Sequence, residues 1–122
     1  MTKEGVDWTP GNDVSGSLVL PTNPKDGDTE YTLIEIGSSA FIRRFYLTSI
    51  EIPNSVKTIG KQAFYGCSEL TSIEIPNSVK TIGGEVFREC KSLTSIEIPK
   101  GITDIASSDF DDCTSMTSIE IH

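Results

Sequence analysis

The sequence predicts an α/β, mainly β, solenoid that carries a parallel sheet on one face and turns with short helices on the other. Two observations lead to this prediction. The fourteen residues 47–60, LTSIEIPNSVKTIG, recur unchanged at 70–83, and the same pattern returns from residue 93. A unit of 23 residues is also too short for a full-length helical return. Each unit is therefore expected to form one flat coil that buries its apolar side chains against its neighbours.

The period divides the chain into repeats and irregular segments. Full repeats span 47–69, 70–92 and 93–115, and a partial repeat covers 116–122. Residues 15–46 are expected to form an irregular first repeat that caps the array, because the strand-like SLVLP is followed by the insertion TNPKDGDTE. Residues 1–14 are expected to extend this cap or to form a linker, and Trp8 favours the cap because a lone tryptophan often covers an exposed apolar end.

Each repeat is expected to begin with a strand. Ile50 and Ile52 flank Glu51, and this alternation is typical of a strand whose glutamate faces outward. Pro53 has no N–H to donate to a neighbouring strand, so the strand ends there, and the Asn-Ser pair that follows favours a turn. The predicted parallel strands lie near 47–52, 70–75, 93–98 and 117–121.

The rest of the repeat is expected to return the chain to the next strand. Val56 and Ile59 point inward from a second short extended stretch, and Gly60 permits the next bend. The segment KQAFYGC at 61–67 has room for one or two turns of helix. Stacked repeats would then place leucine on leucine, isoleucine on isoleucine and phenylalanine on phenylalanine.

The repeat LxxIxIPxxVxxIGxxAFxxC resembles the BspA-like leucine-rich repeat, a surface-antigen type found in bacteria and some protozoan parasites. The resemblance covers 47–121 closely and persists upstream, where Ile36 to Phe41 lie 23 residues before the matching residues of the next repeat. It implies a right-handed leucine-rich repeat superhelix. It also implies a non-enzymatic protein-binding module of the adhesin type, at the cell surface or secreted, that engages host matrix proteins or other cells.

Two other functions stay open from the sequence. An intracellular leucine-rich repeat scaffold, with a cytoplasmic location, would suit the free thiols and the N-terminus, where no charged segment followed by an apolar one indicates export. A structural spacer within a longer surface array would suit the regular repeats. The fold alone does not separate these functions from adhesion.

Composition disfavours two classes of partner. The net charge of −8 opposes attraction to nucleic-acid phosphates or to anionic lipid. No apolar stretch approaches the ~20 residues needed to span a bilayer, so no membrane insertion is expected. The expected partner is a protein, from the extracellular matrix or a cell surface.

Residues typical of catalysis are sparse. His122 is the single histidine, so no set of histidine, carboxylate and nucleophile can assemble. The Gly83-Gly84 pair lacks the strand and long helix that a phosphate-binding loop needs. We therefore expect no enzymatic activity, no catalytic residue and no cofactor.

Three cysteines, Cys67, Cys90 and Cys113, recur at the repeat period. They lack the Cys-x-x-Cys pairs or nearby histidines of a zinc site. Equivalent positions of stacked coils project their Cβ atoms in parallel, which disfavours a disulfide. The sequence predicts three reduced thiols that fill the core beside the phenylalanines.

An acidic cluster lies in the last full repeat, where Asp109 replaces the alanine of the first repeat. Carboxylates at this density could bind calcium, but the segment lacks the DxDxDG order of a calcium loop. We expect no metal site and a solvated end of the array. The cluster comprises Asp104, Asp109, Asp111 and Asp112.

The outward strand positions have the same chemistry in every repeat. Parallel stacking would place successive glutamates about 4.8 Å apart, at a repulsive cost in water of roughly 0.9 kcal/mol per pair. A partner could bind this acidic, hydroxyl-rich strip, although the strip could also serve solubility alone. The predicted binding face consists of Thr48, Glu51, Thr71, Glu74, Thr94, Glu97, Thr117 and Glu120.

The C-terminal end is expected to expose apolar side chains and an unpaired strand edge. Met116, Ile119 and Ile121 would lack a following coil to cover them, and the last strand would keep an open edge. This predicts either self-association through the edge or a further coil that covers it.

Overall fold

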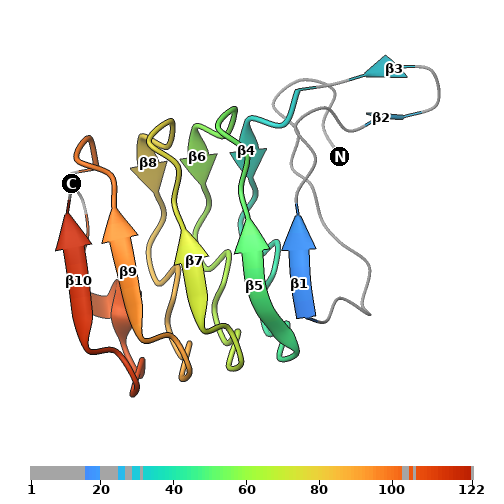
Figure 1. The fold of residues 1–122 in the computed structure, drawn as a ribbon. Helices are drawn as coiled ribbons and strands as arrows, with labels where there is room; N and C mark the ends of the chain where they lie inside the picture. The colour runs from blue at the N-terminus through green and yellow to red at the C-terminus, as the bar shows by residue number, and fades with distance from the viewer. Residues whose placement is uncertain are drawn as a thin grey trace.

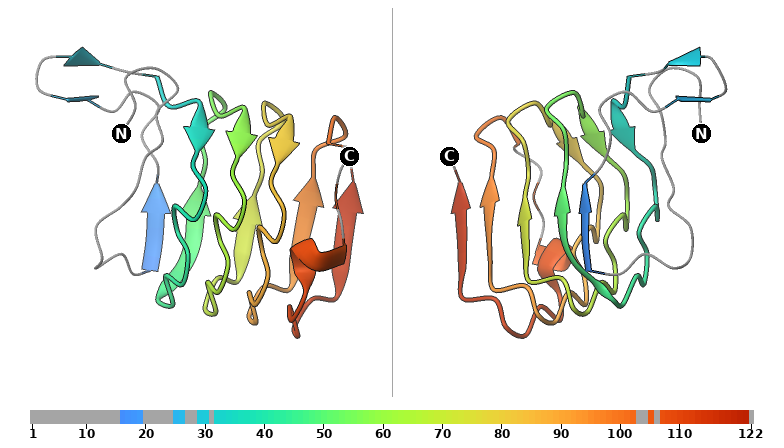
Figure 2. Two further views of the ribbon diagram at one scale, coloured as in Figure 1. Left: turned by 180° about the vertical axis from the view of Figure 1, so that it is seen from behind. Right: turned by 45° about the vertical axis from the view of Figure 1, so that its right-hand side comes forward.

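The computed structural model describes residues 16–19, 25–26, 29–30, 32–102, 105 and 107–121. The repeats form flat coils that stack along one axis, with the strands of the front layer all pointing the same way (Figure 1). Behind this layer the chain returns before it enters the next coil, and the coils advance in a right-handed sense (Figure 2). This is the hand expected for parallel strands joined by crossover connections. The predicted segment 1–14 lies outside the described residues.

The front layer is a parallel sheet in the order β1-β5-β7-β9-β10. Pairing keeps the 23-residue register, so that Ile50 pairs with Ile73 and Ile96 with Ile119. The four predicted strands are confirmed, each within two residues of its expected bounds. The sheet comprises β1 (Gly16–Val19), β5 (Leu47–Glu51), β7 (Ser72–Glu74), β9 (Ser95–Ile98) and β10 (Ser118–Ile121).

The first repeat is longer than the others. Ser17 pairs with Ser49 and Leu18 with Ile50, a separation of 32 residues. Part of the extra length forms a small antiparallel pair, β2 (Lys25–Asp26) with β3 (Thr29–Glu30), inside the predicted insertion. The irregular first repeat therefore keeps its strand in the main sheet.

A second, smaller parallel sheet lies behind the first, in the order β4-β6-β8. Its two-residue strands are β4 (Glu35–Ile36), β6 (Thr58–Ile59) and β8 (Thr81–Ile82). These are the second extended stretches that the sequence predicts. Each presents a buried isoleucine to the core between the two sheets.

The third side of the coil departs from the expected short helices. At 61–67 and 84–90 the chain forms tight turns, and the one helix of the described residues is the 3₁₀-helix η1 (Ser107–Phe110). Two left-handed residues interrupt each turn segment, Gln62 and Gly66 in one coil and Glu85 and Glu89 in the next. A helix cannot continue through such residues.

The turn side is instead held together by hydrogen bonds between coils. The N–H groups of Gln62, Phe64 and Gly66 donate to carbonyls of the next coil, at N···O distances of 2.8–3.0 Å. The intervening N–H groups, such as that of Tyr65, close tight turns within their own coil. Every second amide thus links two coils, which satisfies the backbone without a helix.

Two glycines lie where neighbouring backbones nearly touch. A Cβ on Gly60 would lie 2.5 Å from the backbone N of Ser38, and one on Gly83 would lie 2.3 Å from that of Lys61. Neither glycine has a left-handed φ. Their role is therefore close approach between coils and not the bend that the sequence predicts.

The core consists of columns of like side chains. The rings of Phe41, Phe64, Phe87 and Phe110 stack with centroids 5.3–5.8 Å apart. The burial of the column side chains decreases toward the C-terminal end, where Phe110 and Met116 are only half-buried. There Ile119 is 45% exposed, as predicted for an uncovered last coil.

Candidate functional site: a glutamate ladder and the groove beside it

The four predicted glutamates lie side by side across the front sheet. Glu51 pairs with Glu74, Glu74 with Glu97, and Glu97 with Glu120, and all four side chains are exposed. Glu51, Glu74 and Glu97 each lie between two buried isoleucines, which fix their outward direction. Glu120 follows Ile119, which is exposed in the last strand. We call these four residues the glutamate ladder.

The threonines beside the ladder are partly engaged in structure. The Thr71 hydroxyl donates to the Thr48 carbonyl at 3.2 Å, and the Thr117 hydroxyl donates to the Thr94 carbonyl at 3.1 Å. Thr48 is half-buried, and the other three are exposed. These hydroxyls link neighbouring coils, so their remaining capacity toward a partner is mainly to accept.

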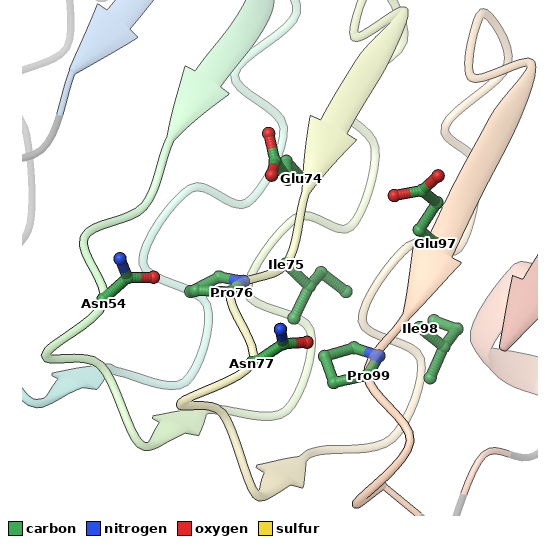
Figure 3. A pocket seen from close by; sticks show the side chains of 8 residues that line it. All are labelled: Asn54, Glu74, Ile75, Pro76, Asn77, Glu97, Ile98 and Pro99. Atoms are coloured by element: carbon green, nitrogen blue, oxygen red, sulfur yellow. The ribbon is translucent and has the colours of Figure 1, made fainter. Parts of the chain in front are cut away.

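A groove runs along the turns where the strands end (Figure 3). Its central hollow, of about 340 Å³, is lined by the carboxylates of Glu74 and Glu97 and by the turn residues below them. An adjoining hollow of about 180 Å³ extends it to Glu51. We call this the Pro–Asn groove, after the turn residues Asn54, Pro76, Asn77 and Pro99 that line it.

The turn residues of the Pro–Asn groove differ in what they offer a ligand. Pro76 and Pro99 are buried and give the groove a rigid apolar lining. Asn54 and Asn77 are exposed, and each amide can both donate and accept hydrogen bonds. The sequence predicts only a turn-forming role for these asparagines. The signal that could have revealed them is the unchanged IPNS at 52–55 and 75–78.

Positively charged side chains lie at one end of the groove, in contrast to the glutamates of its central hollow. A third hollow, also of about 340 Å³, shares Asn77 and Pro99 with the central one and is lined by Lys80, Lys100 and Gly101. The groove therefore passes from carboxylates beside the strands to two ammonium groups beyond the turns.

A different cluster occupies the turn side of the coil. The guanidinium carbons of Arg43 and Arg88 each lie 5.9 Å from the centre of the Tyr65 ring, one from each neighbouring coil. The Tyr65 hydroxyl donates to Glu89 at 2.8 Å, and this hydrogen bond raises the pKa of Tyr65. Phe45 nearby is 49% exposed. These contacts join three coils.

The prediction that the acidic cluster of the last repeat is solvated is wrong for one of its residues. Asp109 is 1% exposed and is therefore not solvated. Its Oδ1 accepts a hydrogen bond of 2.8 Å from the Glu85 N–H. In the coil before, the equivalent N–H, that of Gln62, donates to a backbone carbonyl instead, so the Asp109 side chain takes the place of that carbonyl. Asp111 and Asp112 are exposed as expected, and Asp104 lies outside the described residues. Within the described part of the chain, no group of three or more ligating side chains could hold a metal ion.

The cysteines are free thiols that follow the phenylalanine column. The sulfur atoms of Cys67, Cys90 and Cys113 each donate to the carbonyl of a phenylalanine in the preceding coil, at 3.0–3.1 Å. Burial raises the pKa of Cys67 to about 12 and also raises that of Cys90. The thiols therefore stay protonated at neutral pH and contribute a hydrogen bond as well as packing.

Comparison with known families agrees with this architecture. The family model of the BspA type leucine-rich repeat region matches residues 34–122, in six copies. The chain is a BspA-type leucine-rich repeat protein. Repeats of this family are generally non-enzymatic protein-interaction modules. No curated protein matches the chain.

Solved structures of bacterial leucine-rich repeat proteins have the same solenoid fold as this BspA-type protein. A leucine-rich repeat protein from Bacteroides capillosus, 24% identical, has a TM-score of 0.77 over 87% of this chain and 76% of its own. The T. pallidum leucine-rich repeat protein is 28% identical, with a TM-score of 0.66 over 89% of this chain. A leucine-rich cell surface protein from Faecalibacterium prausnitzii is also 28% identical, with a TM-score of 0.63 over 87% of this chain.

The BspA-type chain is shorter than some of these proteins, spanning 59% of the T. pallidum protein and 35% of the F. prausnitzii protein. Among the described residues, no helix has the length and apolar character to cross a membrane.

Proposed function

We propose that this BspA-type protein is a protein-binding module of the adhesin type, at the cell surface or secreted, and that its partner docks on the strand face. The observation that carries the proposal is the glutamate ladder, four exposed carboxylates in register across neighbouring strands. The cell-surface description of the F. prausnitzii protein supports the location. The partner class is an extracellular matrix or cell-surface protein that presents a basic segment.

The physical basis is the sum of weak contacts. A single exposed ion pair contributes about 0.2–1 kcal/mol, which is too little for stable binding. Four carboxylates spaced about 4.8 Å apart reinforce one another when a single basic segment lies across them. Because the contacts are exposed, salt should screen them strongly.

The test compares two variants with the same change in charge. One replaces the ladder by glutamine at positions 51, 74, 97 and 120. The control removes four carboxylates away from the ladder, through Glu35→Gln, Glu69→Gln, Asp111→Asn and Asp112→Asn. Binding of each protein to a panel of purified extracellular matrix proteins is measured by surface plasmon resonance at low and physiological salt.

We expect the ladder variant to lose at least about tenfold in affinity, the equivalent of ~1.4 kcal/mol, while the control keeps most of its binding. Wild-type affinity should fall steeply as salt rises. Equal losses in both variants, or binding that ignores ionic strength, would show that the ladder serves solubility. In that case the chain is better described as a spacer or an intracellular scaffold.

A further inference from the structure

The Pro–Asn groove carries both signs of charge in adjoining hollows. Its central hollow is lined by Glu74 and Glu97, and its third hollow by Lys80 and Lys100. The two hollows share Asn77 and Pro99, so a single extended chain can contact both. All four charged side chains are exposed.

The cationic end arises from departures in the third repeat. Lys100 stands where the earlier repeats have Asn54 and Asn77, and Gly101 stands where they have serine. Lys80 Nζ lies 3.6 Å from the position that a Cβ on Gly101 would occupy. The missing side chain thus leaves open space directly beside an ammonium group. Lys100 and Gly101 are exposed, so packing does not explain these departures.

We propose that the groove takes an extended peptide segment with basic side chains over the glutamates and an acidic side chain at Lys80 and Lys100. This inference rests on the proposed function, because it assigns the chemistry of the segment that the strand face binds. The amide of Asn77, which lines both hollows, and that of Asn54, which lines the central one, can hydrogen-bond to the peptide backbone. The partner is then a dipolar segment and not a purely basic one.

The sign of one measurement separates these alternatives. This protein has a net charge of −8. If the groove were only an acidic strip, replacing a neutral residue of a basic peptide by glutamate should weaken binding of that peptide. A dipolar groove should bind that peptide more tightly when the glutamate reaches the lysine hollow. A suitably placed ion pair of this exposed kind should change affinity by about two- to fivefold.

The probes are acetylated and amidated peptides that carry a Lys-Ala-Lys segment and one glutamate, separated by none to four alanines and placed on either side. Each has a reference peptide with glutamine in place of the glutamate. Fluorescence anisotropy at low salt gives the dissociation constants. We expect at least one spacing at which the glutamate peptide binds more tightly than its glutamine reference.

Two pairs of variants test where the preference arises. Lys80→Gln/Lys100→Gln should abolish it, whereas the control Lys57→Gln/Lys61→Gln, with the same change in charge, should retain it. Gly101→Asp should also abolish it by placing a carboxylate beside Lys80. Its control, Gly84→Asp, adds the same charge at a position with open space around it and should have no such effect. Circular dichroism checks that every variant is folded.

The outcomes distinguish this inference from the proposed function. If peptides bind through the glutamate ladder but the glutamine references always bind as well or better, the dipolar groove is refuted and the basic-segment proposal stands. A preference that survives both Lys80→Gln/Lys100→Gln and Gly101→Asp also refutes it. If no peptide binds, and the ladder variant still binds matrix proteins fully, both proposals fail together.

Discussion

Single residues in this protein are constrained mainly by the coil above or below them. Gly83 and Gly84 are adjacent in sequence, yet only Gly83 meets a neighbouring backbone. Asp109 and the cysteines show the same dependence, because each forms a hydrogen bond to a residue about one repeat away. Substitutions at this scale should therefore report contacts between coils.

The two glycines give a sharp test of close approach. Gly83→Ala should destabilise the protein by about 1–3 kcal/mol or more, because its Cβ would force apart coils joined by the 2.8 Å bond from the Gly83 N–H to the Ile59 carbonyl. Gly84→Ala should stabilise it by about 0.4–1 kcal/mol, by restricting the unfolded chain. Urea unfolding measures both. Similar effects at the two positions would contradict the close approach.

Asp109 should matter as a hydrogen-bond acceptor. Asp109→Ala restores the alanine of the first repeat but leaves the Glu85 N–H without the Oδ1 that accepts from it. The expected cost is about 1–3 kcal/mol. Asp109→Asn keeps an oxygen in that place and should cost clearly less. If Asp109→Ala instead stabilises the protein, the hydrogen bond from the Glu85 N–H to Asp109 does not contribute to stability.

The buried thiols predict a loss of stability at high pH. The pKa of Cys67 is about 12 in the folded protein, against 9.0 for an unperturbed thiol. Below pH 9 the thiol is neutral in both states, so its contribution to stability is fully present. Between pH 9 and about 12 only the unfolded state ionises, and stability falls. Urea midpoints across this range should decline less in Cys67→Ala than in the wild type.

The same thiols should react slowly in the native protein. Titration with a thiol reagent at neutral pH should detect little reaction at Cys67 and Cys90, and Cys113, which is only half-buried, should react first. Three thiols should appear after unfolding without reductant. Recovery of only one would reveal a disulfide and would overturn this description.

At the scale of elements, the phenylalanine column joins the turn sides of successive coils. Phe87 stacks between Phe64 at 5.7 Å and Phe110 at 5.8 Å, and it is fully buried, whereas Phe110 is only half-buried. Coupling between nearest neighbours is what makes a repeat array cooperative. An interior ring should therefore contribute more than a terminal one.

We expect Phe87→Ala to cost about 3–5 kcal/mol. Phe110→Ala should cost less, because its ring is only half-buried. Thermal and urea unfolding of the two variants give the comparison. A larger loss at Phe110 would mean that the last coil, and not the middle of the array, controls stability.

At the scale of the whole molecule, the last described coil leaves apolar surface exposed at the end of the main sheet. Ile119 is 45% exposed, whereas its column neighbours Ile50, Ile73 and Ile96 are 2–7% exposed. Its strand, β10, is the last of the main sheet, with a free edge among the described residues. Apolar surface at an open strand edge favours pairing with another chain.

This chain on its own should therefore self-associate through β10. Sedimentation velocity should show a mass that rises with concentration, and Ile119→Lys should return it to the monomer while thermal stability changes little. Glu69→Lys, a charge reversal away from the edge, is the control. A wild-type monomer at high concentration would count against this edge as a contact surface.

The sequence by itself determined the parallel sheet, the strand positions, the core columns and the register of the glutamate ladder. The physical reason is the 23-residue period, which places equivalent residues above one another whatever path the chain takes between strands. Glu51 over Glu74 follows from counting residues.

Only the tertiary structure decided the features that depend on which backbone atoms face each other between coils. Left-handed residues such as Gln62 turn alternate N–H groups toward the next coil, so the expected short helices become a ladder of turns. Gly83 and Asp109 acquire their roles from atoms one coil away. The Pro–Asn groove forms for the same reason, because its walls come from successive repeats and a single repeat contains no groove.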